Sequence, residues 1–451
     1  MGLKGREAIK KYFLIFAFLS FILVTTNLSA EYIVVDSNNI PAYTIEDCIN
    51  FVLLNNPSMT EVELLKKMEE ANLSLSKINF LPDLEVEAYY EELKDTPVNE
   101  NQQNTQKYGR TKESIKLTQS IYDGGAKYYS LKEAEANVAS AEYKLRKQTL
   151  ILMYEVKKAY LNYTHFKEVL DVKMEKFASS RDFYEVMEFE YKEGTISRLI
   201  LIDAKMFFHD SIVELRTAVS DYEYAAAKLN ILMGRDFDAP LKTVGISESY
   251  LQRIVAPNPH KALFEALLNR PEVFDLASQV EAYQMRLKKE KAGYQPNLDI
   301  EGKYNFMQHD DQYDDFEDWN VKFKVSLPIL FGQLKTRNKV VMAEAALEVT
   351  ETQRQQLKER ISFEVNRMCS QLNTSRITFM AAQEKLKLGT DRQNIYQVEE
   401  ELGELSRKNM TLSNMDYYDI KEDYLNALYN YYLDRIVLDR VVASKNTQML
   451  F

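Results

Sequence analysis

The sequence predicts a mostly α-helical protein with a small β part, built as an internal duplication. Three observations lead to this prediction: an ordered repeat, four short segments in which apolar and polar residues alternate, and very long stretches with neither glycine nor proline. Charged residues make up 28% of the chain and apolar residues 45%, a composition that excludes both a disordered chain and a protein made chiefly of membrane-spanning helices.

The repeat relates the two halves of the chain. LLNNPSM in the first half is similar to LLNRPEV in the second, and in each case a further proline, Pro82 or Pro296, follows 25 residues after the first. Around these prolines stand FLPDLEVEAYY and YQPNLDIEGKY, followed by KLTQSIYDGG and KVSLPILFGQ. Self-similarity in a fixed order indicates a duplicated unit, with a first repeat over 31–240 and a second over 241–451.

The alternating segments are predicted to be strands at about 83–91, 113–122, 297–306 and 318–328. Each places charged or polar residues on one face and bulky apolar residues on the other. A half-buried antiparallel sheet in a soluble protein would show this pattern. A length of about ten residues also suits a tilted strand that crosses a bilayer, and the polar connections after 91 and 306 are long, as in outer-membrane hairpins.

Membrane strands would require several copies of the chain. Two strand pairs cannot close a barrel, and an open sheet edge in hydrocarbon leaves backbone groups without partners, at a large energetic cost. A trimer would supply twelve strands, an even number compatible with a water-filled interior. The alternative is a periplasmic coiled-coil scaffold with a small soluble sheet and no channel activity.

The long stretches without helix breakers are Ala126–Glu193, Thr195–Met233 and Gln333–Leu388. At a rise of 1.5 Å per residue, a continuous helix over the first would be about 100 Å long, which is typical of coiled coils and bundles. Gly194, followed by Thr195 and Ser197, predicts a helix end and a new N-cap, hence a helical hairpin with its tip near Gly194. The second half predicts a matching tip near 409–413.

Each repeat also predicts a junction where a strand turns into a long helix. Gly124 and Gly125 stand at the first junction and Gly332 at the second, and glycine suits the unusual backbone angles that such a bend requires. Pro82 and Pro296 precede the first strand of each pair. The DGGAK segment at the first junction lacks the spacing of a phosphate-binding loop, so a structural turn is the better interpretation.

The N-terminus resembles a secretory signal. Four basic residues precede an apolar run at 12–24, and TNLSA follows, so a signal peptide over 1–30 is expected, with an uncleaved anchor as the alternative. Cys48 and Cys369 are too few for a disulfide framework, and we expect both to be buried. The net charge of −11 disfavours binding to nucleic acid.

No enzyme constellation is apparent in the sequence. The four histidines are scattered, and no metal-ligand spacing, nucleophile elbow or phosphate loop is present. We therefore expect neither catalysis nor a metal or cofactor. The acidic segment MQHDDQYDDFED in the second strand connection is interpreted as a solvated loop rather than a divalent-cation site.

The paired NNP and NRP segments, FLPDLEV, LTQSIYDGG and EGTISRLILIDA together resemble the TolC-like outer membrane efflux protein family, over roughly 43–443. The resemblance implies a homotrimeric channel-tunnel, in which a twelve-stranded barrel lies among outer-membrane lipid and a long helical barrel crosses the periplasm. It also implies partners: a periplasmic adaptor and an inner-membrane pump of the RND or ABC type. The channel would conduct exported substrates passively, in efflux or type I secretion.

The resemblance further implies two kinds of site. The NMDYYDI segment places Asp416 and Asp419 where the family narrows its periplasmic entrance, and Asp203 aligns with them in the first repeat. Rings of carboxylates at a constriction would attract cations, although aspartates near a helix N-terminus are also ordinary surface residues. The hairpin tips would dock the adaptor, through Gly194, Thr195, Ser197, Arg198 and Leu199 in the first repeat and Met410, Leu412 and Ser413 in the second. Met410 stands where the first tip has Gly194, a departure from the repeat.

Overall fold

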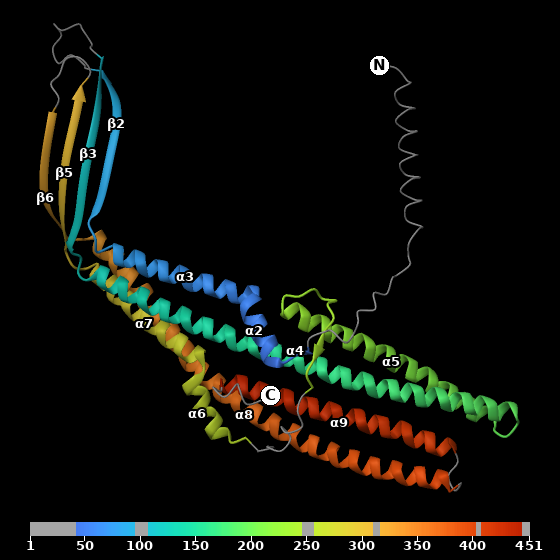
Figure 1. The fold of residues 1–451 in the computed structure, drawn as a ribbon. Coiled ribbons are helices and arrows are strands. Elements are labelled where there is room, and N and C mark those ends of the chain that lie inside the picture. Colours follow the sequence, from blue (N-terminus) through green and yellow to red (C-terminus); the bar gives the residue numbers. More distant parts are fainter. Residues whose placement is uncertain (1–41, 95–106, 246–256, 310–315, 403–406, 444–451) are drawn as a thin grey trace, which may run out of the picture. The chain divides into compact units, whose positions relative to one another are not determined.

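The computed structural model describes residues 42–94, 107–245, 257–309, 316–402 and 407–443 (Figure 1). They fall into two units, a small one with Ala42 and 240–242 and a large one with the rest. All described helices and the four long strands belong to the large unit. The expected signal peptide, the middle of both strand connections (95–106 and 310–315) and 403–406 lie outside the described residues.

The two halves of the large unit contain the same elements in the same order. The paired short helices have 11 and 22 residues in each half, and the long helices have 67 and 35 residues in the first half against 71 and 36 in the second. The first half comprises α2 (Ile45–Asn55), α3 (Pro57–Ile78), β2 (Asp83–Lys94), β3 (Lys107–Tyr122), α4 (Ala126–Lys192) and α5 (Arg198–Leu232). The second comprises α6 (Pro259–Asn269), α7 (Pro271–Ala292), β5 (Asn297–His309), β6 (Phe316–Ser326), α8 (Phe331–Glu401) and α9 (Arg407–Val442). Two-residue strands, β1 (Ala42–Tyr43) and β4 (Lys242–Thr243), complete the described elements. The predicted class, mostly helical with a small β part, is confirmed.

The repeated NNP and NRP segments mark the breaks between the short helices. Pro57 and Pro271 each occupy the first helical turn of α3 and α7, where the missing N–H of proline leaves no hydrogen bond unmade. Asn56 caps α3, its side-chain oxygen accepting a hydrogen bond from the Ser58 N–H at 2.9 Å. The corresponding Arg270 makes no side-chain cap and is used differently, as described below.

The four long strands form one antiparallel sheet in the order β2-β3-β5-β6. The register aligns one apolar row across all four strands: Val86, Ile115, Tyr304 and Trp319. In the protomer these side chains are exposed, from 42% at Tyr304 to 75% at Trp319. The adjacent residues form the polar row Glu85, Lys116, Lys303 and Asn320 on the opposite face. The sheet therefore presents a continuous apolar surface to its surroundings.

The strands extend further than their alternation predicted. Pairing of β2 with β3 continues to Lys94 opposite Lys107, beyond the expected strand ends at 91 and 113. Arg110, which pairs with Glu91, lies in this extension. Polar residues that the sequence assigned to a loop therefore belong to the paired strands. In the second pair β5 continues to His309, while β6 begins earlier than expected and ends at Ser326.

The helical core is centred on α4, which packs against α2, α3, α5, α7 and α9. One buried cluster joins α4 to α8 and α9 through Leu161, Phe379 and Tyr431, and a second joins α6, α8 and α9 around Ile361. Cys48 and Cys369 are both buried and free. Among the described helices, none combines the length and apolarity needed to cross a membrane.

Candidate functional site

The first strand-to-helix junction depends on two glycines and an aspartate. Gly124 and Gly125 have φ angles of +68° and +88°, a left-handed region that disfavours other residues. The carboxylate of Asp123 accepts hydrogen bonds from the N–H groups of Gly125 at 2.9 Å and Lys127 at 2.8 Å, so it caps α4. A Cβ on Gly124 would lie 2.7 Å from the Cβ of Gln295, which is too close. Both the conformation and the close approach therefore require glycine at 124.

Gly332 lies at the second junction, as predicted, but it does not have the unusual backbone angles expected there. Gly332 is the second residue of α8, and the left-handed residue is Leu330, with φ +46°. A Cβ on Gly332 would come within 3.0 Å of the Cβ of Pro328, so its lack of a side chain serves packing rather than a bend. Pro82 and Pro296 stand directly before β2 and β5. The two junctions share topology but not backbone conformation.

The first hairpin tip lies at Gly194, where the sequence predicts it. Gly194 has φ +77°, and the N–H of Thr195 donates to the carbonyl oxygen of Glu190 at 3.0 Å, which closes the end of α4. Ser197 holds the N-cap position of α5, although its side chain makes no capping hydrogen bond. Leu199, in the first turn of α5, is 67% exposed. The tip thus offers an exposed apolar side chain beside polar groups.

The second hairpin tip lies elsewhere than predicted. Helix α8 ends at Glu401 and α9 begins at Arg407, so the turn falls between them and not at 409–413. Met410, Leu412 and Ser413 belong to the first two turns of α9. The sequence holds a signal for the true position: GTISR, which begins at Gly194, is matched by GELSR, which begins at Gly403.

With the hairpin tips aligned in this way, different aspartates of the two repeats occupy equivalent positions. Counted from the starts of α5 and α9, Asp210 and Asp419 occupy the same position, whereas Asp203 lies seven residues earlier. Asp203 is exposed and pairs with no cation among the described residues. No ion pair of the described residues links Asp203 to the other two aspartates, but the neighbouring residues Ala204 and Met415 pack in one buried cluster with Phe183 and Met187.

Asp416 and Asp419 lie one turn apart on α9 and pair with different hairpins. The Oδ2 of Asp416 is 3.4 Å from Nη2 of Arg392 on α8, within the second hairpin. The Oδ1 of Asp419 is 2.8 Å from Nζ of Lys176 on α4, in the first hairpin. Their side chains remain 67% and 59% exposed, so both carboxylates stay accessible to ions.

Asp419 belongs to an ion-pair cluster that joins three helices. Lys173 and Lys176 of α4 have side chains only 11% and 14% exposed, and both contact Glu214 of α5, at 2.7 and 2.9 Å. Lys173 also contacts Glu422 of α9 at 2.5 Å. The two lysines thus hold carboxylates from both hairpins, and we call Lys173, Lys176, Glu214, Glu422 and Asp419 together the inter-hairpin cluster.

The protonation of the cluster follows from these contacts. Burial opposes the charge on Lys176, but hydrogen bonds to Asp419 and Glu214 outweigh it, so the pKa of Lys176 lies above its ordinary value. Burial raises the pKa of Glu214, but the hydrogen bonds from Lys173 and Lys176 lower it by more, so the pKa of Glu214 lies below its ordinary value. Lys176 and Glu214 are therefore both held in their charged forms near neutral pH.

Sequence reasoning did not identify the lysines of this cluster. Lys173 and Lys176 are three residues apart, so they share a face of α4, but many lysines in the chain have such spacing. Their role follows only from the meeting of α4, α5 and α9, which no local pattern encodes.

Residues 48–235, which begin within α2 and extend just past α5, match the family described as outer membrane efflux protein. The resemblance inferred from the repeated segments is thereby confirmed over the first repeat. A comparison with curated protein sequences gives no match.

Solved structures extend the likeness from the efflux family domain to nearly the whole chain. A membrane protein from Pseudomonas aeruginosa has a TM-score of 0.77 at 16% identity, over 88% of this chain and 93% of the other. The CmeC outer membrane channel of Campylobacter jejuni has a TM-score of 0.75 at 16% identity, over 88% and 85%. The outer membrane protein VceC of Vibrio cholerae has 0.75 at 13% identity, over 89% and 96%. The chain therefore has the fold of these proteins.

Proposed function

We propose that this protein is an outer-membrane channel-tunnel that conducts exported substrates passively, as a homotrimer. One observation carries the proposal: the sheet exposes a continuous apolar face and leaves β2 and β6 each with a single neighbour. In a bilayer that face suits lipid, while the two edges require partner strands because hydrocarbon offers no hydrogen bonds. Three copies would join edge to edge into twelve strands, with the polar row lining a water-filled interior.

The partners of the proposed channel follow from the likeness to the efflux family and from the first hairpin tip, where Leu199 is exposed. An inner-membrane pump, of the RND or ABC type, would supply the energy, and a periplasmic adaptor would bind the hairpin tips. In the first repeat the docking residues are Gly194, Thr195, Ser197, Arg198 and Leu199. In the second they are Met410, Leu412 and Ser413 on the first turns of α9. The helices would extend through the periplasm, and the channel would serve efflux or type I secretion.

We place the gate of this channel at Asp416 and Asp419. Asp419 bonds to Lys176 of the other hairpin, and the remaining members of the inter-hairpin cluster hold α4, α5 and α9 together. Separation of the hairpins would break these ion pairs and release carboxylates at the entrance. Three copies of Asp416 and Asp419 would then form a cation-attracting ring.

The channel proposal is tested with the full chain purified in detergent. We expect a trimer by multi-angle light scattering, and discrete conductance steps after insertion into planar bilayers. A buffer-soluble monomer that produces no conductance would contradict the proposal and favour the periplasmic scaffold.

The gate proposal is tested by block with a trivalent cation, hexaamminecobalt. The double variant Asp416→Asn with Asp419→Asn is expected to weaken block of the bilayer conductance at least tenfold. Asp221→Asn, which removes an exposed carboxylate of α5 outside the predicted gate and the inter-hairpin cluster, is the control and is expected to leave block unchanged. Equal block of all three proteins would remove the two aspartates from the gate.

A further inference from the structure

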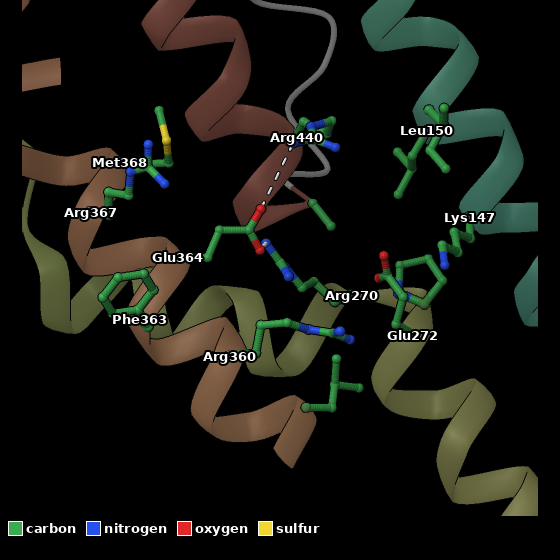
Figure 2. Close-up of a pocket in the computed structure, with 14 residues that line it drawn as sticks. Lys147, Leu150, Arg270, Glu272, Arg360, Phe363, Glu364, Arg367, Met368 and Arg440 are labelled. Atoms are coloured by element: carbon green, nitrogen blue, oxygen red, sulfur yellow. Dashed lines mark hydrogen bonds and ion pairs between the residues drawn. The ribbon is translucent and has the colours of Figure 1, made fainter. Parts of the chain in front are cut away.

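A cavity of about 660 Å³ lies where both repeats meet, away from the hairpin tips. Its walls come from α4, the start of α7, the middle of α8 and the end of α9 (Figure 2). Nothing in the proposed conduction path accounts for it. Its volume falls within the range of small-molecule sites, roughly 300–1,000 Å³.

The cavity is cationic in an acidic protein. Its walls carry five basic side chains: Lys147, Arg270, Arg360, Arg367 and Arg440. Only two carboxylates, Glu272 and Glu364, oppose them. The chain as a whole has a net charge of −11, so this local excess of positive charge is opposite in sign to the rest of the molecule.

One of the two carboxylates, Glu364, already forms ion pairs with arginines of the wall. Glu364 lies between Arg270, whose Nη2 is 2.7 Å from Oε2, and Arg440, whose Nη2 is 3.8 Å from Oε1. Arg270 is only 7% exposed, and its Nε also donates to the carbonyl oxygen of Val441. These contacts fix Arg270 and Glu364 as part of the wall; a guanidinium has no acceptor with which to cap α7, so its donors are free for Glu364 and Val441.

The other basic side chains lack such partners. In the described part of the chain, no carboxylate pairs with Lys147, Arg360 or Arg367. Figure 2 shows Arg360 reaching from α8 towards α7, and the side chain of Lys147 on α4 pointing towards Glu272 at the start of α7. The N-terminus of α7 adds the positive end of a helix dipole at Pro271. Positive charges gathered in a hollow repel one another, and an anion placed among them relieves that repulsion.

The remainder of the wall is apolar. Leu150, Leu357 and Met368 line the same cavity, and Leu357 is fully buried beneath it. A bare inorganic anion would leave this surface without contacts. We propose that the cavity binds an organic anion, a small molecule that carries a phosphate or carboxylate group on an apolar body, with Arg360 holding the anionic group and Arg367 adding to the positive charge around it. The proposal goes beyond channel function and does not depend on it.

The test is calorimetric titration of the purified full chain in detergent with phenyl phosphate, against inorganic phosphate and phenol as probes that lack one feature each. Phenyl phosphate is expected to bind saturably and at least fivefold more tightly than inorganic phosphate, and phenol is expected not to bind. The variant Arg360→Gln with Arg367→Gln should weaken binding of phenyl phosphate at least tenfold, which corresponds to about 1.4 kcal/mol.

The matched control is Arg354→Gln with Lys358→Gln. Both residues are exposed on the same helix, lie outside the cavity wall and have no ion-pair partner among the described residues. This control removes the same charge and is expected to bind phenyl phosphate within twofold of the unaltered protein. Equal weakening in both variants would show a general charge effect and overturn the site. An absence of saturable binding of phenyl phosphate would also overturn the site. If Arg360→Gln with Arg367→Gln changed only the oligomeric state, a second copy of the chain would cover the cavity, and the proposal would again be wrong.

Discussion

The two long helical hairpins have matching lengths but unequal surroundings. Helix α4 of the first hairpin packs against helices of both repeats, whereas α8 of the second packs mainly on α6, α7 and α9. Along α8, Met342, Val349 and Ile377 are spaced by multiples of seven and are 71%, 56% and 55% exposed. Such spacing is typical of a coiled-coil seam. The comparison shows that α4 is covered within the protomer, whereas α8 leaves an apolar stripe exposed, which the proposed trimer would cover.

The largest effect is expected from two isoleucines of α8. Ile361 is fully buried between α6, α8 and α9, so Ile361→Ala should cost about 2–5 kcal/mol and lower the thermal midpoint clearly. Ile377 is 55% exposed on the stripe, so Ile377→Ala should leave the fold of the protomer nearly unchanged and weaken the trimer instead. Circular dichroism melting measures the first effect and light scattering on dilution the second. Equal melting losses would mean that the stripe is already covered within the protomer.

A smaller effect is expected at the two junctions. Gly124→Ala forces a left-handed residue at a cost of about 1–2 kcal/mol and adds a clash with Gln295. Gly332→Ala meets only the Cβ of Pro328, at 3.0 Å, and gains the better helix propensity of alanine, so its melting temperature should change less. A greater loss for Gly332→Ala would show that the second junction is the strained one.

The smallest effect concerns pH and the inter-hairpin cluster. The pKa of Glu214 is lowered in the folded protein, so its contribution is complete above its ordinary pKa of about 4.3 and is lost as pH falls through the folded value. The pKa values of Lys173 and Lys176 are raised, so their contribution is complete below about 10.4 and is lost only at higher pH. Near neutrality Glu214 therefore holds both lysines, within the first hairpin, where they bind Glu422 and Asp419 of the second hairpin.

The measurement is the open fraction of single channels between neutral pH and pH values below about 4. Acidification is expected to raise it a few-fold in the unaltered protein. Glu214→Gln is expected to start from a higher open fraction and to respond less. An identical acid response in both proteins would assign the opening to other carboxylates.

Much of the local structure could be predicted from the sequence. Alternation gave the faces of all four strands, because the side-chain direction in a strand follows from its period of two. Gly124, Gly125 and Gly194 were predicted because positive φ angles favour glycine wherever they occur. The prolines after Asn56 and Arg270 similarly set where short helices break. In each case the signal lies within a few residues of the feature.

Other features were decided only by tertiary structure. The repeat suggested a bend at Gly332, yet the left-handed residue is Leu330, and Gly332 instead accommodates Pro328. Helix α8 runs through Gly389, where Ile420 of α9 approaches closely. The second tip was misplaced because Met410 was matched to Gly194 in place of Gly403.

The contacts of Lys176 show the physical reason most clearly. Its partners Glu214 and Asp419 stand on two other helices, far along the chain, and only the packing of α4 between them brings the charges together. The same holds for the cationic cavity, whose walls come from four helices. Sequence by itself determined the elements and their faces, since these depend on neighbouring residues. The gate contacts and the cavity required the fold, since ion pairs and hollows depend on distances between segments that the chain order does not specify.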